Sequence, residues 1–68
     1  MINWNNSRYL RDNCTSEEVR AVQVTEKCQF ITQQRSYEVP AYDWIVRDSD
    51  NHYHVYSNEY ILSNYKFL

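Results

Sequence analysis

Alternation of apolar and polar residues is the clearest pattern in this chain, and it predicts strands in the middle of the sequence. Valines and an alanine nearly alternate with polar residues from Val19 to Val24, and β-branched residues favour strands. Thr15 and Glu18 have the spacing of a helix-capping box, so a helix is the alternative for this region. We favour a strand from about Val19 to Val24.

The two regions that follow extend the predicted sheet. The run QFITQQRSYEV alternates well enough for one strand or a pair, with a polar turn at residues 33–36. Its inward candidates are Phe30, Tyr37 and Val39. DWIVRD is the clearest apolar strand, and HYHVYS has the composition of its partner. We predict that DSDN is a tight turn joining Trp44–Arg47 to Tyr53–Tyr56, with Asn51 in or near the left-handed conformation.

Helical spacing is found near both ends of the chain. In NNSRYLRDNC, Asn6 or Ser7 could cap a short helix with apolar residues at near-helical offsets, namely Tyr9, Leu10 and Cys14. In NEYILSNYKFL, Ser57 or Asn58 could cap a second helix, whose apolar residues are Tyr60, Ile61 and Tyr65. Phe67 and Leu68 are left as an apolar tail.

These elements predict an α+β fold: a small antiparallel sheet of three to five strands with one or two short helices. We expect one domain over residues 1–68, because no linker, repeat or low-complexity segment interrupts the chain. A domain of this size buries only about 60% of its unfolded surface, so its core is small. A homodimer or a tight partner complex would add stability.

The composition excludes several classes of function. The chain has 68 residues and no glycine, which excludes phosphate loops, dinucleotide fingerprints and glycine-dependent nucleophile elbows. Its net charge is -2 and its basic residues are scattered, so direct nucleic-acid binding is not expected. No apolar run suits a membrane span, and the start lacks the order of a signal peptide. We therefore expect a cytoplasmic protein without membrane contact.

The histidines and cysteines are the candidates for metal binding. On a strand, His52 and His54 would point to the same face, with Asp48 or Asp50 as further ligands. A zinc site needs three or four ligands, so we predict no metal and no cofactor. Cys14 and Cys28 lack a second pair, and we expect reduced thiols that act as small buried hydrophobes. No pairing of these residues forms a catalytic motif, so we assign no catalytic residue and expect no enzyme.

Aromatic residues are the most informative feature, because seven tyrosines, two tryptophans and two phenylalanines make up 16% of the chain. On HYHVYS, Tyr53 and Val55 share one face while Tyr56 shares the other with His52 and His54. We expect one of these faces to expose its rings. Tyrosine and tryptophan are common in protein interfaces. The predicted protein-binding residues are Tyr42, Asp43, Trp44, Tyr56, Glu59 and Tyr60.

Two stretches from Val19 onward combine the predicted strands with the closing helix: VRAVQV and YEVPAYDWIVRDSDNHYHVYSNEYILSNYKFL. In these stretches the chain resembles a family of small uncharacterised bacteriophage proteins. The family pattern is a V-x-A-V-Q strand, a G-D-Y/W-I-V strand, a D-x-x-G turn, an aromatic-rich strand and a closing F-x-x-x-Y helix. In this chain Tyr42 stands where a glycine precedes Asp43, and Asn51 stands near the turn glycine. The resemblance implies a compact β-rich phage domain in the host cytoplasm, without known catalytic residues.

These observations lead to a hypothesis of a small, non-enzymatic, phage-encoded protein that binds a host protein and inhibits or redirects it. Host transcription, host replication and antiviral nucleases such as CRISPR effectors are natural targets, the last implying an anti-CRISPR role. One alternative is a self-associating virion or structural accessory protein. Another is a metal-dependent nucleic-acid enzyme.

Overall fold

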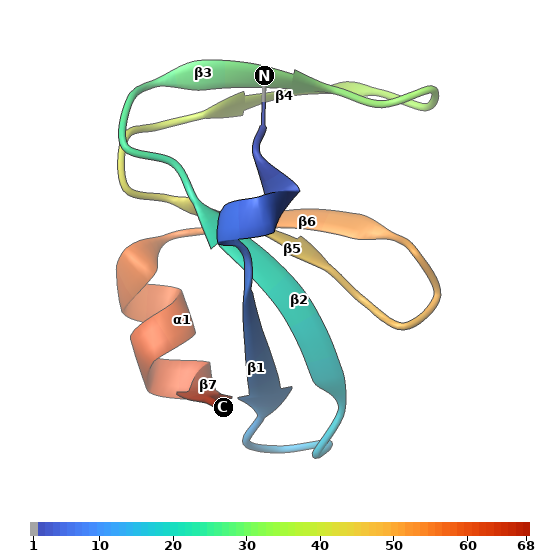
Figure 1. The fold of residues 1–68 in the computed structure, drawn as a ribbon, viewed down its shortest axis with the longest axis vertical. Helices are drawn as coiled ribbons and strands as arrows, with labels where there is room; N and C mark the ends of the chain where they lie inside the picture. The colour runs from blue at the N-terminus through green and yellow to red at the C-terminus, as the bar shows by residue number, and fades with distance from the viewer. Residues whose placement is uncertain (1) are drawn as a thin grey trace.

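The computed structural model describes residues 2–68 as short strands with little helix (Figure 1). In chain order the elements are the 3-10 helix η1 (Trp4–Asn6), β1 (Arg8–Asp12), β2 (Glu18–Gln23), β3 (Cys28–Ile31), β4 (Ser36–Val39), β5 (Trp44–Arg47), β6 (Tyr53–Tyr56), α1 (Asn58–Asn64) and β7 (Tyr65–Phe67). The only α-helix in this part of the chain has 7 residues.

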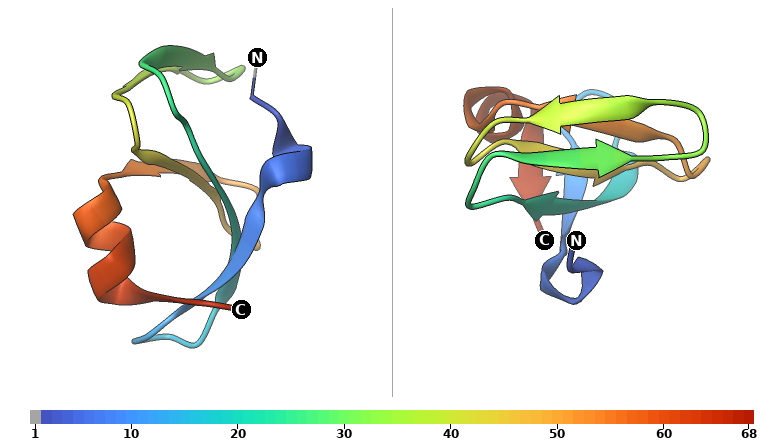
Figure 2. Two further views of the ribbon diagram at one scale, coloured as in Figure 1. Left: turned by 60° about the vertical axis from the view of Figure 1, so that its left-hand side comes forward. Right: turned by 90° about the horizontal axis from the view of Figure 1, so that it is seen from above.

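The strands form two sheets with antiparallel pairing throughout. A five-stranded sheet has the order β6-β5-β2-β1-β7, and β3 pairs with β4 in a separate two-stranded sheet. The β3–β4 hairpin lies as a layer over β5 and β6 (Figure 2). The larger sheet curls toward α1, which links its two edge strands, β6 and β7 (Figure 2).

Both faces of the five-stranded sheet are buried at its centre. On β5, Trp44 and Val46 point to the side of α1, whereas Ile45 points to the side of the β3–β4 hairpin, because side chains alternate along a strand. The α1-side core consists of Leu10, Val19, Ala21, Trp44, Val46 and Ile61. The hairpin-side core consists of Val22, Val24, Val39 and Ile45. The sheet is therefore the middle of three layers.

Most of the predicted strands are confirmed. The strand predicted near Val19–Val24 is β2, DWIVRD contains β5, and HYHVYS contains β6. QFITQQRSYEV forms a pair of strands, and its predicted inward residues Phe30 and Tyr37 pack against the hairpin-side core. The α+β class holds in its coarse form. The fold is mostly β, however, because a two-stranded sheet adds to the five-stranded one.

The helix predicted near the N-terminus is wrong. Asn3 caps the single turn η1, and residues 8–12 then continue as strand β1. Leu10 is fully buried opposite Val19, and this pairing between β1 and β2 outweighs the weak helical spacing of the segment. Tertiary contact therefore decides the structure of this segment.

The C-terminal segment is only partly as predicted. Ser57 caps α1, with its Oγ accepting a hydrogen bond from the backbone N–H of Tyr60 at 3.2 Å. The helix ends at Asn64, and the predicted apolar tail contributes to strand β7. Phe67 packs on Trp44 with ring centroids 5.7 Å apart. This contact holds the end of the chain on the sheet.

The cysteines are less buried than predicted. Cys14 is exposed in the β1–β2 turn and Cys28 is half-buried at the start of β3, and both are free thiols. Cys14 follows Asp12, whose Oδ1 accepts a hydrogen bond from the Cys14 backbone N–H at 2.8 Å. The conformation of the turn therefore places this thiol outside the core.

Among residues 2–68, no helix has the length and apolar character that a membrane span requires.

The DSDN turn is confirmed, and it joins β5 to β6 between the predicted residues. Asn51 has φ 63°, in the left-handed region, and its backbone N–H donates to the Asp48 carbonyl at 3.0 Å. Tyr42, with φ 70°, and Ser16, with φ 63°, share this conformation. In a chain without glycine, these residues adopt left-handed turns that glycine would form with less strain.

The turn predicts that Asn51→Gly is neutral or stabilising by up to about 0.5 kcal/mol. Glycine removes the strain of positive φ, while its greater freedom in the unfolded chain offsets part of the gain. Chemical denaturation followed by tryptophan fluorescence measures the change. A loss of more than about 1 kcal/mol would contradict the role of Asn51 in this turn.

Candidate functional site

Most of the predicted protein-binding residues come from three segments that meet beside the start of α1. Tyr42 and Asp43 lie between β4 and β5, Tyr56 ends β6, and Glu59 and Tyr60 lie in the first turn of α1. The Gln23 side chain links two of these segments. Its Nε2 donates to the Tyr42 carbonyl at 2.9 Å and to Asn58 Oδ1 at 3.3 Å. Residues that are distant in sequence are therefore held together.

The buried side chain of Trp44 packs beneath this region and holds it in place. Its side chain is only 4% exposed and belongs to the α1-side core. Its Nε1 donates a hydrogen bond to Asn58 Oδ1 at 2.9 Å, which fixes the start of α1 against β5. A partner could not reach this ring in the folded protein. Trp44 is therefore a positioning residue beneath the predicted face.

The exposed part of the region is a stack of aromatic rings. Tyr56 on β6 and Tyr60 on α1 have centroids 4.4 Å apart and planes 18° apart. The His54 ring stacks on Tyr56 with centroids 5.7 Å apart, and the centroid of the Tyr65 ring is 6.4 Å from that of Tyr56. Tyr60 is 44% exposed and Tyr42 is 60% exposed. His54 and Tyr65 were not among the residues predicted for this face, although His54 shares a strand face with Tyr56.

The prediction that one face of β6 exposes its aromatic rings is wrong. All four residues of β6 are half-buried. Tyr53 contacts Phe30 with centroids 5.1 Å apart, beneath the β3–β4 hairpin. Tyr56 packs against the α1-side core. Each face of this strand is therefore covered in part, and the exposed aromatic area is contributed mainly by α1 and by the Tyr42 loop.

Burial and neighbouring charge keep the tyrosine hydroxyls protonated. Burial raises the pKa of Tyr56, and Tyr60, Asp12 and Asp48 raise it further. Burial is also the main cause that raises the pKa of Tyr65 to about 12, with Tyr56, Asp12, Tyr60 and Glu17 adding to the shift. Both rings are therefore neutral at physiological pH, with hydroxyls able to donate hydrogen bonds. The carboxylates that act on them lie at the end of β1, in the β1–β2 turn and in the β5–β6 turn.

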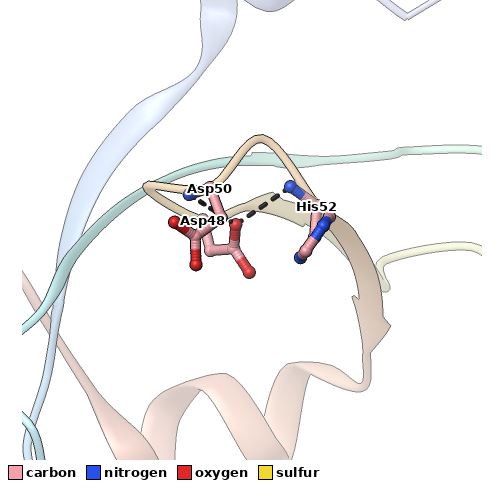
Figure 3. Close-up of side chains that lie close together, drawn as sticks. All are labelled: Asp48, Asp50 and His52. Carbon is pink, nitrogen blue, oxygen red and sulfur yellow. Dashed lines mark hydrogen bonds between the residues drawn. The ribbon is translucent and has the colours of Figure 1, made fainter.

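Asp48 organises the β5–β6 turn (Figure 3). Its Oδ1 accepts hydrogen bonds from the backbone N–H groups of Asp50 and His52, both at 2.9 Å, and its Oδ2 lies 3.0 Å from His54 Nε2. Desolvation raises the pKa of Asp48, but the bonds from His54 and the two backbone amides outweigh it and hold that pKa below its ordinary value. The ionised carboxylate is therefore the form that the turn favours.

The same turn brings together three groups that could hold a cation. Ligand atoms of Asp48, Asp50 and His52 lie within 4.8 Å of one another (Figure 3). His52 precedes β6 and is exposed, and it belongs to this cluster, whereas His54 does not. Both oxygens of Asp48 already accept hydrogen bonds. An ion would have to compete with the bonds that shape the turn.

A cleft of about 710 Å³ lies between the tip of the β3–β4 hairpin and the β5–β6 turn. Phe30, Tyr37 and Tyr53 contribute to its walls, and the Arg35 guanidinium lies over the Tyr37 ring at 5.1 Å. The cleft could not be predicted from the sequence, because no pattern shows how the hairpin packs on the sheet. Among residues 2–68, every buried side-chain nitrogen or oxygen has a hydrogen-bond partner. The described residues thus show no orphaned polar group of the kind that often marks a reactive pocket.

Asp48→Asn should destabilise the protein by about 1 kcal/mol at neutral pH, because the charge-assisted bond to His54 is lost while an acceptor for the backbone amides remains. The pKa of Asp48 is lowered by folding, so its ionised form stabilises the protein above its unfolded pKa. That stabilisation is lost as the pH falls through the folded pKa, which lies below the ordinary value for aspartate. The stabilities of wild type and Asp48→Asn should therefore converge as the pH falls. Thermal unfolding of both proteins from neutral pH to about pH 3 measures this. The exposed Asp50→Asn is the matched control, and a constant difference between Asp48→Asn and wild type across this range would contradict the assignment.

Chelation should leave the thermal stability unchanged to within about 2 °C, because the three clustered groups are fewer than a closed zinc site requires. The measurement is differential scanning fluorimetry with and without excess EDTA, together with elemental analysis of the purified protein. Stoichiometric zinc, or a large fall in melting temperature with EDTA, would show that the turn is a metal site.

Comparisons with protein-family models, curated proteins and solved structures found no match for this chain. Its function must therefore be inferred from its own residues.

Proposed function

We propose that this chain is a non-enzymatic, phage-encoded protein that binds a host protein and inhibits or redirects it. The surface we assign to this role is the exposed aromatic surface formed by Tyr42, Tyr56 and Tyr60, with Asp43 and Glu59 at its rim. The phage setting rests on the resemblance of the Val19–Leu68 region to small phage proteins. An antiviral nuclease such as a CRISPR effector is one target class that fits this setting.

The observation that carries the proposal is the stack of Tyr56 and Tyr60, with ring centroids 4.4 Å apart. Tyr56 is fixed by the α1-side core, while Tyr60 remains 44% exposed. A ring that is already held in place loses little conformational entropy when a partner covers it. Such rigid, partly exposed tyrosines are typical binding hot spots.

The backbone at Tyr42 is a second point in favour of this surface. A non-glycine residue in the left-handed conformation costs roughly 1–2 kcal/mol, and Tyr42 has φ 70° with its side chain 60% exposed. Because the Tyr42 side chain is largely exposed, its burial offsets little of this cost. Strain of this kind is concentrated at functional positions, which favours a role for the Tyr42 ring in binding.

The intramolecular contacts of the arginine side chains favour a protein partner over nucleic acid. Four of the five arginines lie over aromatic rings of the protein itself: Arg8, Arg20, Arg35 and Arg47. The fifth, Arg11, pairs with Glu18 at 3.1 Å. A nucleic-acid interface needs a group of cations aimed at phosphates. The guanidinium groups of this chain instead stack within the fold.

Tyr60→Ala and Tyr42→Gly should each weaken capture of the host protein by about 2 kcal/mol, or roughly thirtyfold in Kd, because a hot-spot ring is lost. Tyr42→Gly is the sharper of the two variants, since relief of positive φ should raise its melting temperature. A loss of binding in a more stable protein could not come from unfolding. The measurements are pull-down from host lysate with mass spectrometry, followed by titration against the purified target.

Tyr9→Ala is the matched control, because Tyr9 is 57% exposed but lies on the other face of the sheet. It should bind like wild type. Full binding by folded Tyr60→Ala and Tyr42→Gly would contradict the assigned surface. Failure of the wild-type protein to retain any host protein would contradict the proposed function.

A further inference from the structure

The two faces of the five-stranded sheet differ in charge, although the face away from α1 also carries one acid, Glu18, which pairs with Arg11 at 3.1 Å. Strand alternation places Asp12 of β1, together with Asp48 at the end of β5, on the same side as Leu10, Val46 and α1. The opposite side carries most of the sheet's cations, namely Arg11, Arg20, Arg47 and Lys66. Arg8 is the one strand cation on the α1 side, and its guanidinium lies 4.4 Å from the centre of the Phe67 ring, at the other end of β1 from Asp12.

The acidic groups on the α1 side lie around the tyrosine stack. The charges of Asp12 and Asp48 act on Tyr56, and those of Asp12 and Glu17 act on Tyr65. Glu17 Oε2 accepts a hydrogen bond from Ser49 Oγ at 2.6 Å, which ties the β1–β2 turn to the β5–β6 turn. Glu17 and Asp48 therefore come from two turns that are held next to each other, and Asp12 lies at the end of β1 beside the first of them. All three are half-buried.

We infer that this tyrosine–carboxylate surface, formed by Asp12, Glu17, Asp48, Tyr56, Tyr60 and Tyr65, binds an arginine- or lysine-containing segment of a partner protein. The inference rests on the proposed function and names the chemistry of the partner. A guanidinium or ammonium group is attracted to the face of a tyrosine ring and to nearby carboxylates. The backbone N–H of Asn13, in the β1–β2 turn, donates to the Asn64 carbonyl at the end of α1 at 2.9 Å, so the turn that carries Glu17 is held against the helix that carries Tyr60.

Charge complementarity selects this occupant over the others. A second copy docked through the same surface would place carboxylates against carboxylates, because a two-fold interface joins identical patches. A nucleic acid would meet the same repulsion. The two nearby imidazoles both lie beside Asp48: His54 Nε2 is 3.0 Å from its Oδ2, and a ring nitrogen of His52 lies within 4.8 Å of its carboxylate. A basic segment is the partner whose charge opposes that of the surface.

The test uses the full chain and a short peptide of alternating arginine and glycine, followed by amide-resolved NMR. We expect shifts concentrated at residues 12–17 and 54–60. In the double variant Tyr60→Ala/Glu17→Gln the peptide should bind about fivefold more weakly, since one ring and one charge are lost. Glutamine keeps an acceptor for Ser49, so the contact between the turns is retained. A peptide of alternating glutamate and glycine should cause no comparable shifts.

Tyr9→Ala/Glu18→Gln is the matched control, with the same chemical changes on the opposite face of the sheet. It should bind the arginine peptide like wild type. Equal weakening in both double variants, shifts on the Tyr9 face, or no binding of the arginine peptide would overturn the inference. If a host protein is captured through Tyr42 and Tyr60 while the arginine peptide does not bind, this inference alone fails. If the peptide binds as expected but no host protein is retained, the proposed function alone fails.

Discussion

The fold depends on the burial of β5 from both sides. Trp44, Ile45 and Val46 are adjacent and all buried, so each face of the central sheet needs its own cover. The chain provides α1 for one face and the β3–β4 hairpin for the other. A single layer of this length would leave one apolar face in water at a cost of about 25 cal/mol per Å². The positions of the other elements follow from how α1 and the β3–β4 hairpin pack on the two faces of the sheet.

This requirement also creates the candidate site. A helix of 7 residues is too short to cover the whole α1 side of a five-stranded sheet. Ile61 fills the middle, while the rings of Tyr56, Tyr60 and Tyr65 remain half-covered at the margin of the helix. The Trp44–Asn58 hydrogen bond sets where the helix starts, and therefore where Tyr60 lies. The aromatic surface is thus a direct consequence of how the core is closed.

The strands could be predicted from the sequence where alternation is strong and local, as in the segments that became β2, β5 and β6. β1 could not, because its helical spacing is weak and its strand structure comes from pairing with β2 and β7. The same error hid part of the site. Asp12 and Glu17 approach the tyrosines only because residues 8–23 form a hairpin. Tyr60 was predicted for the surface, whereas the burial of Trp44 depends on contacts with Asn58 and Phe67 that no local pattern shows.

The left-handed residues connect stability to function. Asn51 and Tyr42 both have positive φ, the conformation that glycine adopts with least strain. At Asn51 this conformation costs little, because asparagine tolerates it better than most residues. Tyrosine at position 42 is more strained, and no hydrogen bond from its side chain is found among the described residues to offset the strain. The fold alone therefore gives no reason for a tyrosine there. An exposed ring beside the start of α1 is explained if a partner protein covers it.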